Sequence, residues 1–318
     1  MEAAHASSRK VGIVGTGMVG ASFAYALMQR SLATEIVLVD LDHERAAGEA
    51  MDLNHGLPFV RPVTIRAGDY SDLAGADLVV MTAGANQRPG QTRLDLLQRN
   101  ARICREIVPQ VFHHNPDGLL VIASNPVDIL THIANEVAQL PWGRIIGSGT
   151  ILDTARFRYL IGSYFEVDPR SVHAYIIGEH GDSAVPVWSL ANIAGIRLPE
   201  FRAPRGRTFD QTAIDAIFEQ TRNAAYEIIK RKQATYYAIG LGLLTLVEAI
   251  VRNQRTVLTV STPVHGTYGV TDIALSLPTI VGRQGAIEVL DLDLDAAEQA
   301  GFAASAQTLR HKLAQVEP

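Results

Sequence analysis

Two segments of this chain carry residue types that together could move a hydride and a proton. The first is a glycine-rich turn over residues 15–20, and the second is the segment 178–183, which contains His180. A glycine-rich turn can seat a dinucleotide, and an imidazole exchanges protons near neutral pH. Reduction of a carbonyl with a nicotinamide needs both a bound cofactor and a proton source. The pairing therefore predicts an oxidoreductase.

The turn has the spacing G-x-G-x-x-G. The first glycine permits a tight turn, the second lets the backbone approach a pyrophosphate, and the third allows close helix–strand packing. A purely structural turn is the alternative, but a turn placed between an apolar run and a helical segment favours cofactor binding. The predicted contacts in the turn are Gly15, Thr16, Gly17, Met18, Val19 and Gly20.

An acidic residue follows the turn at the interval of about 20 residues that this fingerprint expects. Asp40 closes the second β-branched run of the chain. A carboxylate there can accept hydrogen bonds from ribose hydroxyls and would repel a 2′-phosphate, which favours NAD over NADP. The alternative is a solvated carboxylate at the end of a strand.

Apolar runs alternate with helical segments through the first half of the chain. The runs cover residues 10–14, 35–39, 63–67, 78–82, 119–123 and 144–146, and the helical segments cover 22–29, 42–54, 93–112 and 128–139. Continuous apolar strands alternating with helices are what a parallel sheet covered on both faces requires. The pattern predicts an α/β fold with a doubly wound, parallel Rossmann sheet.

The pattern changes near residues 147–149. Beyond it we expect helices over residues 151–161, two long helices within 209–248, an antiparallel strand pair at 257–264 and 267–277, and a closing helix over 296–316. This is an α+β arrangement. We therefore predict an NAD-binding Rossmann domain over residues 9–148 and a substrate domain over 149–318.

Composition argues against several other classes of protein. The net charge is −5 and the longest basic run is only residues 230–232, so we expect no nucleic-acid interface. The longest apolar stretch, 239–251, contains Glu248 and is shorter than the roughly 20 residues that cross a bilayer, so it predicts a buried helix. Residues 1–8 lack the apolar core of a signal peptide. The single cysteine, Cys104, excludes an internal disulfide. A soluble cytoplasmic protein is expected.

Five motifs together resemble those of the L-lactate dehydrogenase family, and most closely its bacterial allosteric branch. They lie at residues 83–90, 93–96, 124–128, 149–156 and 178–183, and the resemblance runs from Gly12 to about Ser276. It implies an enzyme that interconverts pyruvate and L-lactate with NAD, and a homotetramer. It also implies that Tyr70, Gly84, Ala85, Ser124 and Asn125 contact the cofactor.

The resemblance assigns the chemistry to three residues. His180 would give a proton to the substrate carbonyl oxygen, and Asp153 would orient its ring and stabilise its charged form. Asp153 and Arg156 are three residues apart and share a helix face, so Arg156 could hold a substrate carboxylate with two parallel hydrogen bonds. A buried structural histidine and a surface ion pair are the alternatives.

Other positions follow from the same resemblance. Residues 84–92 would form a lid that brings Arg93 to the reacting carbonyl oxygen, Asn125 would donate a hydrogen bond to that oxygen, and Thr235 would form a wall of the substrate pocket. Gln87 occupies the position that discriminates between substrates. An arginine there would favour oxaloacetate, whereas glutamine favours pyruvate; the neighbouring Arg88 keeps malate dehydrogenase open as an alternative.

A regulatory site is also implied. Arg158 and His173 match positions where the allosteric branch binds fructose 1,6-bisphosphate between subunits. Arg158 is about 200° around a helix from Arg156, so the two guanidiniums are expected to point in opposite directions. An interface ion pair is the alternative for Arg158. A nucleotide-binding regulator without catalytic activity is the alternative for the whole chain, and it predicts broken catalytic motifs, which this sequence does not have.

Overall fold

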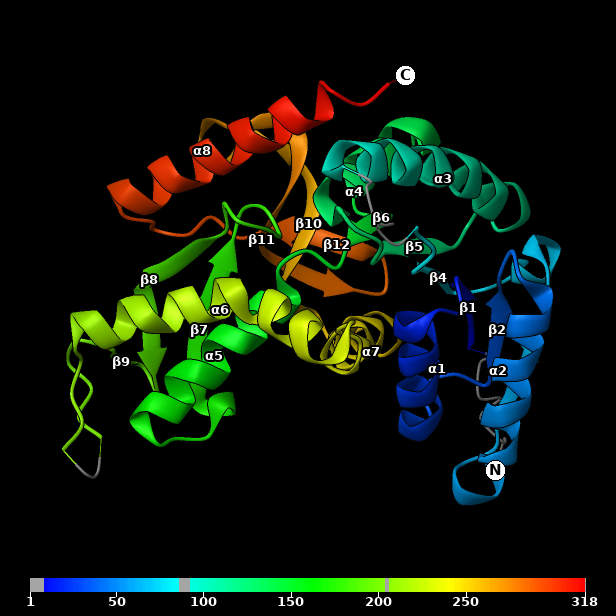
Figure 1. Cartoon of the computed structure of the whole chain (residues 1–318), viewed down its shortest axis with the longest axis horizontal. Helices are drawn as coiled ribbons and strands as arrows, with labels where there is room; N and C mark the ends of the chain where they lie inside the picture. The colour runs from blue at the N-terminus through cyan, green and yellow to red at the C-terminus, as the bar shows by residue number, and fades with distance from the viewer. Residues whose placement is uncertain (1–8, 86–91, 204–205, 318) are drawn as a thin grey trace, which may run out of the picture.

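The computed structural model describes residues 9–85, 92–203 and 206–317. Its largest element is a nine-stranded sheet with the order β12-β11-β10-β6-β5-β4-β1-β2-β3 (Figure 1). The six strands at the β3 end are parallel to one another, which confirms the predicted doubly wound sheet. They are β1 (Lys10–Val14), β2 (Glu35–Val39), β3 (Thr64–Ala67), β4 (Leu78–Met81), β5 (Leu119–Ile122) and β6 (Ile145–Gly147).

Helices cover both faces of this sheet, which explains why most of its parallel strands are buried along nearly their whole length. The four helices of this half are α1 (Met18–Arg30), α2 (His43–His55), α3 (Arg93–His114) and α4 (Val127–Ala138). One buried apolar cluster joins the sheet to α1, α2 and the later α7 (Tyr237–Val251), and a second joins it to α3, α4 and the closing α8 (Ala296–Leu313). Figure 1 shows α1 and α2 apart from α3 and α4, with the strands between them.

The strand order reverses between β1 and β4, which lie side by side. Ligands of open parallel sheets bind at such a point, beyond the carboxyl ends of the strands. The glycine turn follows β1 there, and residues 82–85 follow β4. The fold therefore places both predicted cofactor-binding segments at one edge of the sheet.

The sheet continues beyond the predicted domain boundary. The antiparallel pair β10 (Thr256–His265) and β11 (Thr271–Gly282) is confirmed, and β12 (Gly285–Val289), which was not predicted, pairs with β11. A contact between Ser261 of β10 and Gly147 of β6 joins these strands to the parallel part. The division into residues 9–148 and 149–318 stays a prediction, because strands from both sides of it form one sheet.

A second, three-stranded antiparallel sheet was also not predicted. It consists of β7 (Val172–Ile177), β8 (Val185–Ile193) and β9 (Ile196–Arg197). Its strands alternate buried and partly exposed residues, a weaker signal than the apolar runs of the first half. It packs with α5 (Ile151–Phe165) and α6 (Gln211–Lys232) around a third apolar cluster.

Helix α7 joins the two halves of the molecule by packing against α1 (Figure 1). Gly240 permits the close approach, because a Cβ there would lie 3.3 Å from the backbone nitrogen of Phe23. The predicted helix is confirmed, but it is not buried on all sides, since Tyr237 and Leu241 are exposed. Within the described part of the chain, no helix is both long and apolar enough to cross a membrane.

Candidate active site

The glycine turn has the geometry of a phosphate cradle. Gly15 has φ of +99°, and a Cβ there would lie 2.4 Å from the backbone nitrogen of Ala83. A Cβ on Gly20 would lie 2.0 Å from the carbonyl oxygen of Gly15, so both positions require glycine. A Cβ on Gly17 would meet nothing within 4 Å. This open space faces the start of α1, which has no side-chain cap, so its first N–H groups are available to a pyrophosphate.

Asp40 contacts the same turn. Its Oδ2 accepts hydrogen bonds from the backbone N–H of Thr16 at 2.5 Å and from the Thr16 hydroxyl at 2.9 Å, and its Oδ1 accepts one from the Asp42 N–H at 3.0 Å. Partial burial opposes ionisation, but these hydrogen bonds outweigh it and lower the pKa of Asp40. The carboxylate is therefore charged at neutral pH, as recognition of ribose hydroxyls requires. The turn and Asp40 fit an NAD cofactor.

A network of hydrogen bonds organises the rest of the cofactor edge. Ser124 donates to the carbonyl oxygen of Ala83 at 2.5 Å. Asn100, a buried residue of α3, accepts from the backbone N–H of Ala85 at 2.8 Å and donates to the carbonyl oxygen of Asn125 at 2.8 Å. Sequence reasoning missed Asn100, although a lone amide among the buried apolar positions of a helix is a usable signal.

Tyr70 lies half-buried in the short helix Tyr70–Leu73. Burial raises the pKa of its hydroxyl, and the negative charge of Asp40 adds to that rise. Gly84 is exposed and Ala85 is half-buried, directly after β4. The predicted cofactor residues thus surround one edge, and their contacts with NAD remain a prediction.

The central feature of the site is a chain of three charged side chains. The Nδ1 of His180 lies 2.5 Å from Oδ2 of Asp153, and Oδ1 of Asp153 accepts a hydrogen bond from Nη1 of Arg156 at 3.1 Å. Asp153 is buried in the first turn of α5, and Arg156 lies one turn later on the same face. His180 follows β7 in a loop, so the fold brings it to Asp153 from a different element.

Charge and burial set the protonation of this chain. The negative charge of Asp153 raises the pKa of His180 to about 9, although burial of the ring opposes the shift. Burial also opposes ionisation of Asp153, but the positive charges of His180 and Arg156 outweigh it and lower its pKa. His180 is thus an imidazolium near neutral pH. With Nδ1 donating to Asp153, its Nε2–H is available to a ligand.

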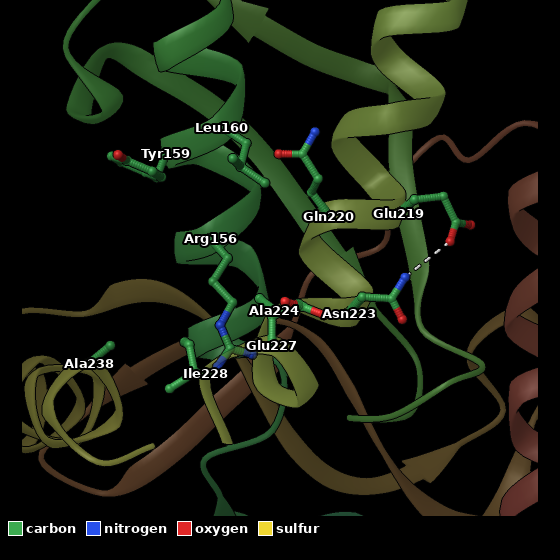
Figure 2. A pocket seen from close by; sticks show the side chains of 10 residues that line it. All are labelled: Arg156, Tyr159, Leu160, Glu219, Gln220, Asn223, Ala224, Glu227, Ile228 and Ala238. Atoms are coloured by element: carbon green, nitrogen blue, oxygen red, sulfur yellow. Dashed lines mark hydrogen bonds between the residues drawn. The ribbon is translucent and has the colours of Figure 1, made fainter. Parts of the chain in front are cut away.

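Arg156 also lines a cavity of about 520 Å³ between α5, α6 and the start of α7 (Figure 2). The other walls include Leu160 on α5, Asn223 and Glu227 on α6, and Ala238 on α7. Thr235 is half-buried in the joint between α6 and α7, close in sequence to Ala238. Its predicted place in the pocket wall remains a prediction.

Arg93 and Asn125 approach the site from the cofactor half. Arg93 is the first residue of α3, is largely exposed, and lies 3.7 Å from Oδ2 of Asp182, two residues beyond His180. Asn125 is exposed after β5 and precedes Pro126 through a cis peptide bond. Within the described residues, neither side chain forms a hydrogen bond with His180. Gln87, Arg88 and most of the predicted lid lie outside the described residues.

Arg158 and His173 lie elsewhere. Arg158 donates from Nη2 to the carbonyl oxygens of Pro169 at 3.4 Å and Arg170 at 3.3 Å, so its contacts differ from those of Arg156. Its Nε is buried and has no hydrogen-bond partner within residues 9–85, 92–203 and 206–317. His173 is exposed on β7. In the same part of the chain, no group of three or more His, Cys, Asp or Glu residues could hold a metal ion.

Comparison with known proteins agrees with this arrangement along the whole chain. Residues 9–147 match the family model for the NAD binding domain of lactate/malate dehydrogenases, and residues 150–318 match the model for their alpha/beta C-terminal domain. An L-lactate dehydrogenase of Priestia megaterium is 49% identical over 303 residues, which are 95% of each chain. One from Acetivibrio thermocellus is 50% identical over 302 residues, again 95% of each.

A solved structure gives the same result in three dimensions. The minor L-lactate dehydrogenase of Enterococcus mundtii, in a ligand-bound form, superposes with a TM-score of 0.94 at 46% identity and covers 98% of this chain and 99% of its own. The family models match nearly the whole chain, and the relatives are far more similar than a shared fold alone requires. This chain belongs to the lactate/malate dehydrogenase family.

Proposed function

We propose that this protein is an NAD-dependent L-lactate dehydrogenase that interconverts pyruvate and L-lactate. The observation that carries the proposal is the continuous chain His180–Asp153–Arg156, in which a proton carrier and a carboxylate-binding guanidinium share one buried aspartate. A non-catalytic regulator has no need of such an arrangement. The relatives of this chain that are named L-lactate dehydrogenases support the same activity.

NAD would be held by the glycine turn and Asp40, with Tyr70, Gly84, Ala85, Ser124 and Asn125 around it. When reduced, the cofactor supplies the hydride for the carbonyl carbon. His180 holds a proton at Nε2, ready for the carbonyl oxygen, and Asp153 keeps the ring oriented and charged. The same ring accepts the proton back from the lactate hydroxyl in the reverse direction.

Arg156 orients the substrate. A guanidinium has five N–H donors in a planar fork, and only one of those of Arg156 is engaged with Asp153. The remaining donors can bind a carboxylate with two parallel hydrogen bonds. Arg93 and Asn125 would polarise the carbonyl oxygen, and exclusion of water would strengthen this effect.

The protonation of His180 predicts opposite pH dependences for the two directions. Pyruvate reduction needs the imidazolium, so its kcat/KM should be flat at low pH and fall about tenfold per unit above the pKa of about 9. Lactate oxidation needs the neutral ring, so its kcat/KM should rise with pH up to the same midpoint. Initial rates of NADH absorbance change measure both. A midpoint near the ordinary 6.5 would contradict the role given to Asp153.

Choice of substrate is tested by comparing NADH oxidation with pyruvate and with oxaloacetate. We expect a preference for pyruvate, because Gln87 offers no positive charge to a second carboxylate. Gln87→Arg should shift the ratio of the two kcat/KM values toward oxaloacetate by about 100-fold, the order of one charge-assisted pair. Gln87→Leu is the matched control for loss of the amide alone. A preference for oxaloacetate in the unaltered protein would identify it as a malate dehydrogenase, and no turnover of either would favour a regulator.

We further propose that fructose 1,6-bisphosphate activates the enzyme through Arg158 and His173. The buried Nε of Arg158, which has no hydrogen-bond partner among the described residues, and the exposed ring of His173 support an anion site. Activation requires that the effector bind the more active state better. Pyruvate saturation curves should therefore shift to lower pyruvate concentration when the bisphosphate is present. Superimposable curves would disprove the site, and Arg158→Gln should abolish the shift.

We also propose a homotetramer located in the cytoplasm. The motif resemblance to the L-lactate dehydrogenase family implies the assembly, and a single buried thiol at Cys104 suits a reducing compartment. Light scattering coupled to gel filtration measures the mass of the assembly directly, and a monomeric mass would contradict the proposal.

A further inference from the structure

The main chain of His180 is held by a second carboxylate that the mechanism above does not use. Asp128 lies in the first turn of α4, 1% exposed, and its Oδ2 accepts a hydrogen bond from the backbone N–H of His180 at 2.7 Å. The side-chain hydroxyl of Ser276 on β11 lies 3.4 Å from its Oδ1. His180 is therefore held by its ring through Asp153 and by its backbone through Asp128.

This contact links two parts of the site that are far apart in the chain. Asp128 follows Asn125 by three residues, in the segment between β5 and α4 that forms part of the cofactor edge. His180 lies 52 residues further on, in the loop after β7. The loop has glycines at 178 and 181, so its path depends on bonds from neighbouring elements. The other anchors nearby are Ser276, which pairs with Gly178, and Ser305 of α8, whose hydroxyl accepts from the Glu179 N–H.

Among the described residues, the charged groups that act most strongly on His180 and Asp128 belong to α4, α5 and the loop after β7. His180 faces Asp153 and Arg156 from α5 and Asp128 from α4. Asp128 faces His180 and Glu179 from the loop, with Ser261 of β10 and Ser276 of β11 as its neutral neighbours. Glu179 is itself paired with Lys312 of α8. Burial raises the pKa of Asp128 to about 6, so the carboxylate is charged above that pH and its charge stabilises the imidazolium.

We propose that Asp128 is a positioning residue that fixes the backbone of His180 against the segment carrying Asn125, and that its charge adds to that of Asp153 in keeping the ring protonated. One buried carboxylate, that of Asp128, thereby fixes the position of His180 relative to Asn125. The catalytic consequence rests on the proposed lactate dehydrogenase activity. The electrostatic consequence does not, because it concerns the ring of His180 in the protein without substrate.

Two substitutions separate the two roles. Asp128→Asn keeps the size of the side chain and an oxygen that can accept from the His180 N–H, but removes the charge. Asp128→Ala removes both. We expect Asp128→Asn to keep kcat within about threefold while the pH midpoint of pyruvate reduction moves down by about 0.5–1 unit. We expect Asp128→Ala to show the same downward shift and a fall in kcat of about 10–100-fold, because the loop loses its anchor.

A direct titration of His180 tests the electrostatic role of Asp128 without relying on enzyme activity. Histidine-labelled protein without cofactor is followed by NMR across pH, with the His180 signal assigned through its absence in His180→Asn. The His180 midpoint should move down in Asp128→Asn. Glu298→Gln is the matched control, because Glu298 is also buried and also accepts a backbone N–H, that of Ser189 at 2.8 Å, but does not face His180. It should leave both the midpoint and kcat unchanged.

The outcomes are distinguishable. An unshifted His180 titration in Asp128→Asn would overturn the electrostatic role, and Asp128→Ala with unaltered kcat would overturn the positioning role. If Asp128→Ala does not fold, Asp128→Asn still tests the positioning role, because its amide oxygen can accept the hydrogen bond from the His180 N–H. A loss of kcat in Asp128→Asn far beyond the expected threefold would contradict that role. A shifted titration in a protein that reduces neither pyruvate nor oxaloacetate would sustain the electrostatic role and reject only the proposed function.

Discussion

His180→Asn is expected to lower the kcat of pyruvate reduction by about 100- to 10,000-fold, the range that a positioned general acid contributes. Asparagine is smaller than histidine but retains polar atoms near Asp153, and it cannot supply a proton. The substitution removes the imidazole ring, whose Nδ1 bonds to Asp153 and whose pKa that carboxylate raises to about 9 in the unaltered protein. Stopped-flow and steady-state NADH absorbance measure the change.

Binding of NADH to this variant should stay within about twofold of the unaltered protein, because His180 belongs to the loop after β7 and the cradle is built from residues 15–20 and Asp40. Quenching of protein fluorescence measures that affinity. His55→Asn, an exposed histidine at the end of α2, is the matched control and should leave turnover unchanged. If turnover survived in His180→Asn, another group would have to supply the proton.

Arg156→Lys is the second large effect, with an expected loss of about 100- to 1,000-fold in kcat/KM for pyruvate. Lysine keeps the positive charge beside Asp153, so the protonation of His180 is preserved. It cannot form two parallel hydrogen bonds to a carboxylate in one plane, so the substrate is bound less tightly and is less well oriented. The expected loss in kcat/KM corresponds to about 3–4 kcal/mol of transition-state stabilisation. We attribute it to the changed geometry of the carboxylate contact, because the charge is kept.

A substrate without a carboxylate identifies the contact. The unaltered protein should discriminate strongly between pyruvate and its methyl ester, and Arg156→Lys should lose most of that discrimination. Arg170→Lys is the matched control, because Arg170 also pairs with a nearby aspartate, Asp168, but is exposed and belongs to a different element. Equal losses for pyruvate and the ester would show that Arg156 acts on the fold of α5 and not on the carboxylate.

Much of the cofactor half could be predicted from the sequence because its signals are local. Most of the parallel strands are nearly continuous apolar runs, so β1 and β2 begin and end where the runs do. The exception is β3, which includes Thr64 and Arg66. The spacing of glycines requires a tight turn wherever it occurs between a strand and a helix. The weaker elements were missed for the same reason: β7, β8 and β12 alternate in burial or include polar residues, and their pairing depends on partners far along the chain.

The order of amino acids establishes which chemical groups are present and which near neighbours share a helix face. The spacing of Asp153 and Arg156 predicts their contact, since three residues are close to one helical turn. His180 lies 27 residues from Asp153 and 52 residues from Asp128 in the sequence. Its contacts with both carboxylates arise from the packing of the loop after β7 against α4 and α5, and local sequence patterns do not predict them. The pKa of about 9 for His180 follows from these contacts, because attraction between charges depends on distance in space and on burial, and neither is encoded in the spacing of residues along the chain.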